Sequence, residues 1–122
     1  MANKNIIIAE DSSVLQNLIK KILLQINCTT KGVKNGDALL KELATNQYDM
    51  VLLDINIPKK NGIECLKEIR ANKSKEELPV IAVTGNADNL STYEFENLGF
   101  NDVILKPIDF DSLVVGVEKW LK

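Results

Sequence analysis

A continuous apolar run, Met50 to Leu53, leads directly into the carboxylate of Asp54, and Pro58 and Gly62 follow. Such a run suits a strand that is buried on both faces of a parallel sheet. Asp54 is then expected at the carboxyl end of that strand, the edge of an open α/β sheet where ligands bind. Taken alone, an aspartate at a strand-to-loop junction is more simply explained by turn formation, because its side chain accepts hydrogen bonds from nearby N–H groups.

Strand-like and helix-like segments alternate along the whole chain. The strand segments are short and apolar, and they are predicted at 5–9, 28–33, 50–54, 79–84 and 102–105. Each is followed by a helix signal; the first helix carries apolar residues at positions 14, 15, 18, 19, 22, 23 and 26. Five such units predict a doubly wound parallel sheet covered by helices on both faces, with right-handed crossovers.

Capping residues mark where these helices begin. The signals are a serine cap at 12–13, Asn35 before Gly36, Asn61 with Glu64 three residues later, and Asp109. The fourth helix, near 89–98, has the least regular pattern, and Gly99 is expected to end it. Leu113, Val114, Val117 and Leu121 are expected to face inward from the last helix.

Length and composition limit the possible functions. The 122 residues predict one domain over 1–122, and 15 basic against 17 acidic residues, with no basic stripe, predict no direct binding to nucleic acid or membrane. The apolar run at 6–9 is too short for a signal peptide, so a cytoplasmic location is expected. Cys28 and Cys65 lack metal-ligand spacing and are expected as buried thiols. The absence of histidine excludes a Ser-His-Asp triad and a phosphohistidine carrier.

Polar residues end four of the five predicted strands. Glu10 and Asp11 come at the end of the first strand, Asp54 ends the third, Thr84 ends the fourth and Lys106 comes at the end of the fifth. Singly, each is explained by capping, turn formation or solvation. Jointly, they belong to one edge of the sheet. Three carboxylates without histidine or thiolate favour a hard cation such as Mg²⁺, and a lysine with a hydroxyl favours a phosphoryl group.

In these residues the chain resembles the response-regulator receiver domains of two-component signalling, over essentially its whole length. Glu10-Asp11 matches the acidic pair, Asp54 the phosphorylated aspartate, Thr84 the switch hydroxyl and Lys106-Pro107 the Lys-Pro signature. The spacing from Asp54 through Pro58 to Gly62 also matches. The resemblance implies a flavodoxin-like fold with strand order 2-1-3-4-5.

The resemblance also implies a set of roles. Asp54 would accept a phosphoryl group from a histidine kinase or phosphotransfer protein. Mg²⁺ would be bound directly by Asp11 and Asp54, through water by Glu10 and by the backbone carbonyl of Asn56. Such a domain catalyses its own modification and is not an ordinary turnover enzyme.

Lys106 and Thr84 would hold the phosphoryl oxygens, and the peptide bond before Pro107 would be cis. The chain departs from the family pattern in two places. Glu10 stands where aspartate is commoner in the family. Its side chain is longer by one methylene, and the property that this difference affects is the affinity for the metal. Val103 stands where many receivers carry an aromatic residue, and its short, stiff side chain predicts a switch that acts through the backbone after Thr84, with large shifts over 85–98 on activation.

Several alternatives remain open from the sequence. The chain is also consistent with a receiver segment of a larger hybrid kinase or DNA-binding regulator, with an aspartyl-nucleophile phosphatase, or with a pseudo-receiver that only docks partners. An FMN-binding flavodoxin is disfavoured because Glu10-Asp11 would repel a phosphate after the first strand. A phosphatase of the haloacid-dehalogenase type is disfavoured by Asn56, where a second acidic residue would be needed.

Overall fold

The computed structural model describes residues 3–85 and 92–121. Within these residues five parallel strands form one sheet in the order β2-β1-β3-β4-β5. The strands are β1 (Lys4–Ala9), β2 (Cys28–Val33), β3 (Met50–Asp54), β4 (Val80–Thr84) and β5 (Asp102–Leu105). The helices are α1 (Ser13–Leu24), α2 (Gly36–Thr45), α3 (Gly62–Asn72), α4 (Thr92–Leu98) and α5 (Phe110–Trp120). The flavodoxin-like strand order is therefore confirmed.

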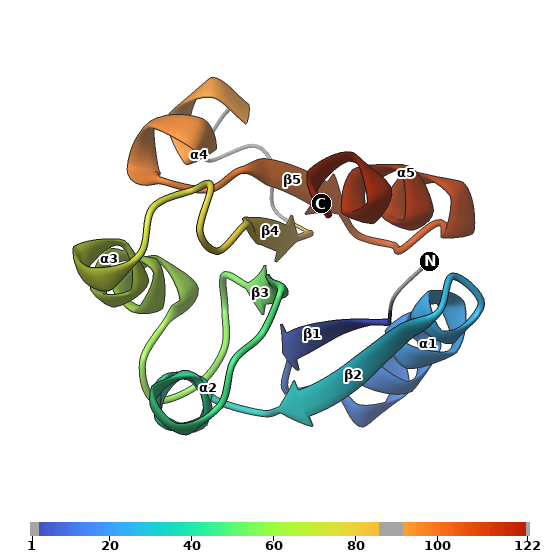
Figure 1. Cartoon of the computed structure of the whole chain (residues 1–122), viewed down its shortest axis with the longest axis horizontal. Coiled ribbons are helices and arrows are strands. Elements are labelled where there is room, and N and C mark those ends of the chain that lie inside the picture. Colours follow the sequence, from blue (N-terminus) through green and yellow to red (C-terminus); the bar gives the residue numbers. More distant parts are fainter. Residues whose placement is uncertain (1–2, 86–91, 122) are drawn as a thin grey trace.

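Helices cover both faces of the sheet, as Figure 1 shows: α1 and α5 on one face, and α2, α3 and α4 on the other. The core consequently has two halves, because successive side chains of a strand point to opposite faces. Val51 and Leu53 of β3 pack with α2 and α3, whereas Met50 and Leu52 pack with α1 and α5. Each fully buried aliphatic side chain contributes about 1.5–3 kcal/mol.

The predicted helix caps are present. Ser12, Asn35, Asn61 and Asp109 each accept a hydrogen bond from a backbone N–H in the first turn of their helix. At Asn61 the capping box is complete, since the Glu64 side chain in turn accepts from the Asn61 N–H. These bonds satisfy N–H groups that have no partner within the helix.

The carboxyl end of α4 is also as predicted. Gly99 follows the helix with φ +120°, a conformation that suits glycine because it lacks a Cβ atom. Residues 89–91, which the sequence pattern assigned to the start of this helix, lie outside the described residues. The described helix begins at Thr92.

The predicted apolar stripe of α1 is wrong at its first turns. Val14 is 82% exposed and Leu18 is 42% exposed, whereas Gln16 is only 6% exposed. The helix is rotated so that Gln16, Ile19 and Leu23 face the sheet. The first turn of α1 is therefore held to the sheet by the hydrogen bonds of a buried glutamine as well as by the apolar contact of Leu15.

Both cysteines are buried free thiols, as predicted. Burial raises the pKa of Cys65 to about 11. Its thiol donates a hydrogen bond to the carbonyl oxygen of Lys60, with a distance of 3.5 Å between sulfur and oxygen. In the part of the chain that the structure describes, no helix combines the length and apolar character needed to cross a bilayer.

Candidate functional site

The carboxyl ends of four strands meet at one edge of the sheet. Asp54 and Thr84 are the last residues of β3 and β4, while Glu10 and Lys106 directly follow β1 and β5. The parallel register aligns these ends, because Asp54 lies beside Val83 and Thr84 lies beside Leu105. The expectation that these polar side chains share one edge is confirmed.

Three carboxylates lie close together there. One oxygen each from Glu10, Asp11 and Asp54 lies within 4.8 Å of the others. Glu10 is 2% exposed and Asp54 is 4% exposed, whereas Asp11 is open to solvent. Buried like charges at this separation repel strongly, so the arrangement favours a bound cation or a retained proton.

Lys106 lies beside these acids and contacts two of them. Its ammonium nitrogen donates a hydrogen bond to Asp54 Oδ2 at 3.0 Å and lies 3.1 Å from Glu10 Oε1. Burial alone would lower the pKa of Lys106, but the contacts with Asp54 and Glu10 outweigh it and raise the pKa. The lysine therefore remains charged and neutralises part of the acidic cluster.

The Glu10 carboxylate shows that the site is suited to a further cation. Its Oε2 accepts from the Ser12 N–H at 3.0 Å. Its Oε1 is buried and has no hydrogen-bond partner among the described residues, although the Lys106 ammonium is near it. Burial is the main cause of a raised pKa of Glu10. A buried carboxylate oxygen without a hydrogen bond is a costly arrangement that a water or a hard cation would relieve.

The loop after Asp54 holds that side chain in place. Asp54 Oδ1 accepts from the Asn56 N–H at 3.0 Å, which closes a tight turn. The Gly62 N–H donates to the Ile55 carbonyl at 2.9 Å, and a Cβ atom on Gly62 would lie only 2.8 Å from the Asp54 carbonyl oxygen. Gly62 is thus required because α3 begins against the backbone of the aspartate.

Thr84 and Lys106 are joined through the backbone, since the Lys106 N–H donates to the Thr84 carbonyl at 2.9 Å. Thr84 is 2% exposed. The peptide bond between Lys106 and Pro107 is cis, as predicted. Val103 is half-buried and packs against the core half under α2, α3 and α4. The predicted movement over 85–98 falls partly on residues 86–91, which lie outside the described residues.

Gln16 is a site neighbour that the sequence pattern did not reveal. Its Nε2 donates to the carbonyl oxygens of Glu10 and Val33. The available signal was only a polar residue four positions after the capping Ser12, outside the predicted apolar stripe of the helix. Nothing in that signal identifies the partner atoms, which come from two different strand ends.

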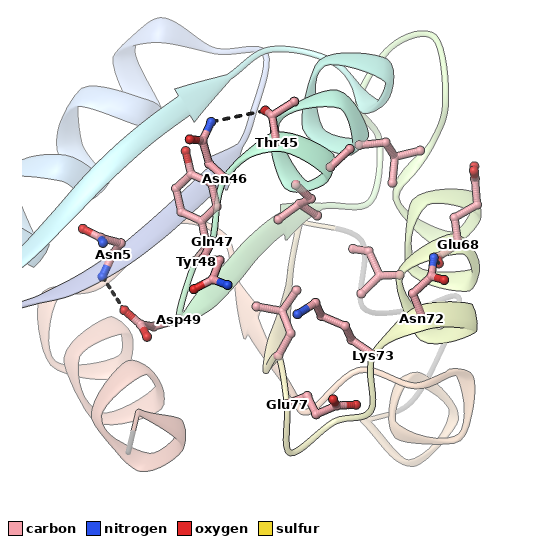
Figure 2. A pocket seen from close by; sticks show the side chains of 15 residues that line it. Asn5, Thr45, Asn46, Gln47, Tyr48, Asp49, Glu68, Asn72, Lys73 and Glu77 are labelled. Atoms are coloured by element: carbon pink, nitrogen blue, oxygen red, sulfur yellow. Dashed lines mark hydrogen bonds between the residues drawn. The ribbon is translucent and has the colours of Figure 1, made fainter.

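A hollow of about 850 Å³ lies at the opposite edge of the sheet, between the carboxyl ends of α2 and α3 (Figure 2). Its lining includes Asn5, Tyr48 and Asp49, which lie at the amino ends of strands. Asp49 accepts from the Asn5 N–H there, so this carboxylate is occupied in joining β1 to β3. The hollow is therefore separate from the acidic cluster.

Comparisons with known proteins agree with this geometry. The family model described as response regulator receiver domain matches residues 6–118. Chemotaxis protein CheY-3 of Vibrio cholerae is 30% identical over 96% of this chain and 91% of its own length. Transcription factor SKN7 of Saccharomyces cerevisiae is 31% identical over 97% of this chain. The chain spans only 19% of SKN7, and about half (54%) of a Helicobacter pylori transcriptional regulatory protein that it also matches.

Among solved structures, the receiver domain of a Pseudomonas aeruginosa sensor histidine kinase superposes with a TM-score of 0.86. It is 28% identical, and the match covers 98% of each chain. That structure is described as having a magnesium ion coordinated in the active site cleft.

Proposed function

Since the chain belongs to the response regulator receiver domain family of two-component signalling, we propose that Asp54 accepts a phosphoryl group from a phosphohistidine of a histidine kinase or phosphotransfer protein. The observation that carries this proposal is the position of Asp54. Its carboxylate is buried at the end of the central strand, bonded to the Lys106 ammonium at 3.0 Å and adjacent to two further carboxylates.

In the proposed reaction, a carboxylate oxygen of Asp54 attacks the donor phosphorus. A P–O bond forms as the P–N bond to the donor imidazole breaks, and the electron pair returns to the imidazole nitrogen. The backbone N–H of Asn56 and the Lys106 ammonium hold the carboxylate during attack. In the aspartyl-phosphate product, Lys106 and Thr84 bind the phosphoryl oxygens.

We assign the acidic cluster to Mg²⁺, with Asp11 and Asp54 as direct ligands, Glu10 acting through water and Asn56 contributing its backbone carbonyl. The grouping of three carboxylate oxygens and the buried, unbonded Glu10 Oε1 support this assignment. Bound there, the cation neutralises the negative charge that keeps a phosphoryl donor away from a carboxylate nucleophile. Glu10 has one methylene more than aspartate, and this longer reach is compatible with contact through a water molecule.

The domain is then both the substrate and the catalyst of its own modification, and it transmits the modified state to an output protein or domain. The output is not the same among the relatives, which include a chemotaxis protein and transcription factors. Val103 lacks the aromatic ring whose reorientation serves as a switch in many receivers. We therefore assign the output to backbone changes after Thr84.

Acetyl phosphate provides the direct test, because it needs no partner protein. With Mg²⁺ the intact mass is expected to rise by one phosphoryl group, and Asp54→Asn or excess chelator is expected to abolish the rise. A phosphoryl adduct that persists in Asp54→Asn would show that the acceptor is another residue. Sustained release of phosphate over many turnovers would instead identify an aspartyl phosphatase.

A further inference from the structure

We propose that Gln16 is a positioning residue for Glu10, and through Glu10 for the divalent cation at the acidic cluster. The inference rests on the proposed function, because it assigns a second layer of contacts to the same site. Gln16 itself does not contact the reacting atoms. It acts on the backbone from which the Glu10 carboxylate extends.

Two hydrogen bonds from one amide carry the inference. Gln16 Nε2 donates to the carbonyl oxygen of Glu10 at 2.7 Å and to that of Val33 at 2.8 Å. Gln16 is only 6% exposed, so neither bond is easily replaced by bulk water. Glu10 has just left the β1 ladder, with its N–H still donating to Val33 at 3.0 Å. The Gln16 amide therefore satisfies the first carbonyl beyond the ladder.

Gly32 provides the space for this amide. A Cβ atom at Gly32 would lie 2.2 Å from Gln16 Oε1 and 2.7 Å from Gln16 Cδ, which is closer than real contacts allow. The glutamine side chain thus fills a space that only glycine leaves open. The fit of one long polar side chain against one glycine makes the two positions interdependent.

Glu10 depends on this support because its carboxylate has few other fixed contacts. Oε2 accepts from the Ser12 N–H, and Oε1 lies 3.1 Å from the Lys106 ammonium, which is shared with Asp54. Ser12 lies in the turn that Gln16 ties to the sheet, since the Gln16 N–H donates to the Ser12 carbonyl at 3.0 Å. Loss of the Gln16 side-chain amide would remove the bonds to the Glu10 and Val33 carbonyls, and the turn would then be held only by its backbone hydrogen bonds. Outer-shell contacts that orient direct metal ligands typically change metal affinity 10- to 100-fold, and we expect the lower end of this range here because Glu10 acts through water.

The first experiment replaces the amide with an apolar side chain of similar length, Gln16→Met. Magnesium binding is measured calorimetrically and by amide chemical shifts, without any phosphodonor. We expect the dissociation constant for Mg²⁺ to rise about tenfold. The rate of phosphorylation by acetyl phosphate at saturating Mg²⁺ is expected to stay within about twofold of the wild type. Asn17→Met, at an exposed position on the same helix, is the matched control and should leave both quantities unchanged.

The second experiment uses the interdependence of the two positions. Gly32→Ala alone should weaken Mg²⁺ binding several-fold, because the new methyl group displaces the amide. In a Gln16→Ala background the side chain is already absent, so Gly32→Ala should add nothing. This pair tests the proposal even if Gln16→Met folds poorly.

Two results would overturn the positioning role. One is an unchanged Mg²⁺ dissociation constant in folded Gln16→Met, and the other is independent, additive effects of Gly32→Ala and Gln16→Ala. Lower thermal stability with unchanged Mg²⁺ binding would assign Gln16 a purely structural role. Failure of the proposed function would be distinguishable from failure of this proposal, because the wild type would then form no phosphoryl adduct at Asp54.

Discussion

The charges at the site do not balance within the protein. When Glu10, Asp11 and Asp54 are ionised they carry three negative charges, and Lys106 supplies one positive charge. The net charge of the cluster is then −2, which one divalent cation would neutralise. A second lysine would still leave one negative charge uncompensated, whereas a divalent cation balances the cluster. The single lysine therefore agrees with a site that receives a cation and an anion together.

At the opposite edge of the sheet, Tyr48 allows a pH-dependent prediction. Its hydroxyl donates to Glu42 Oε1 at 2.6 Å beside the hollow of Figure 2. Burial and then this carboxylate raise the pKa of Tyr48 to about 12. Because the folded pKa lies above the ordinary value of about 10, the protonated phenol stabilises the fold. That stabilisation is complete below pH 10 and is lost as the pH rises to 12.

Absorbance titration of tyrosinate is the measurement. The wild type should show one component near pH 12 that Tyr48→Phe removes, and Tyr48→Phe should lower stability by about 1 kcal/mol at pH 7. Tyr93→Phe removes the chain's other tyrosine and should retain the late component. Titration of Tyr48 near pH 10 would contradict the prediction.

At the scale of elements, the sequence predicted best where one pattern dominates. The continuous apolar run of β3 and the complete capping box of α3 left few alternatives, and both lie where expected. The convergence of Glu10, Asp54 and Lys106 was also predictable, because parallel strands bring their carboxyl ends together. Their distances were not, since these depend on side-chain directions that spacing does not determine.

The first turns of α1 show why the orientation of a helix could not be predicted from the sequence pattern alone. Periodicity counts apolar residues, and Val14 and Leu18 contributed to the count although they are exposed. The buried face of the helix also includes Gln16, whose amide donates to two carbonyl oxygens that belong to other elements. A long-range hydrogen bond of this kind leaves no periodic trace in the sequence.

Arg70 of α3 connects three elements and supports a prediction about stability. Its guanidinium group donates to the carbonyl oxygens of Gly99, Leu78 and Ser74 at 2.7–3.0 Å and to Asn101 Oδ1 at 2.9 Å. These bonds join α3 to the end of α4 and to the loop before β4. Arg70→Met would leave several partly buried acceptors without donors. We expect it to lower the free energy of unfolding by about 2–3 kcal/mol.

Urea denaturation provides the measurement for Arg70→Met. Lys67→Met, an equal loss of charge at an exposed position of the same helix, is the control and should change stability by less than about 0.5 kcal/mol. Equal denaturation midpoints for the two variants would show that the guanidinium contacts contribute nothing measurable.

For the whole molecule, the acidic cluster is expected to cost stability in the absence of a cation. Its three carboxylates lie at the end of a sheet whose other residues are mainly apolar and well packed. Unfolding separates the charges and releases their repulsion. A cation that binds only the folded chain stabilises it by about 1.4 kcal/mol at ten times its dissociation constant, or about 5 °C in Tm for a domain of this size.

Asp11→Asn tests this balance, because Asp11 is the exposed member of the cluster. In EDTA the variant should melt about 2–4 °C above the wild type, since one of the repelling charges is gone. As Mg²⁺ is added, the wild-type Tm should rise while that of Asp11→Asn changes little, so the two curves cross. Thermal melts followed by circular dichroism at several Mg²⁺ concentrations measure both effects. Glu118→Gln removes the same charge at an exposed position of α5 and is the control for net charge. A lower Tm for Asp11→Asn in EDTA would mean that Asp11 holds the local fold more than it repels its neighbours.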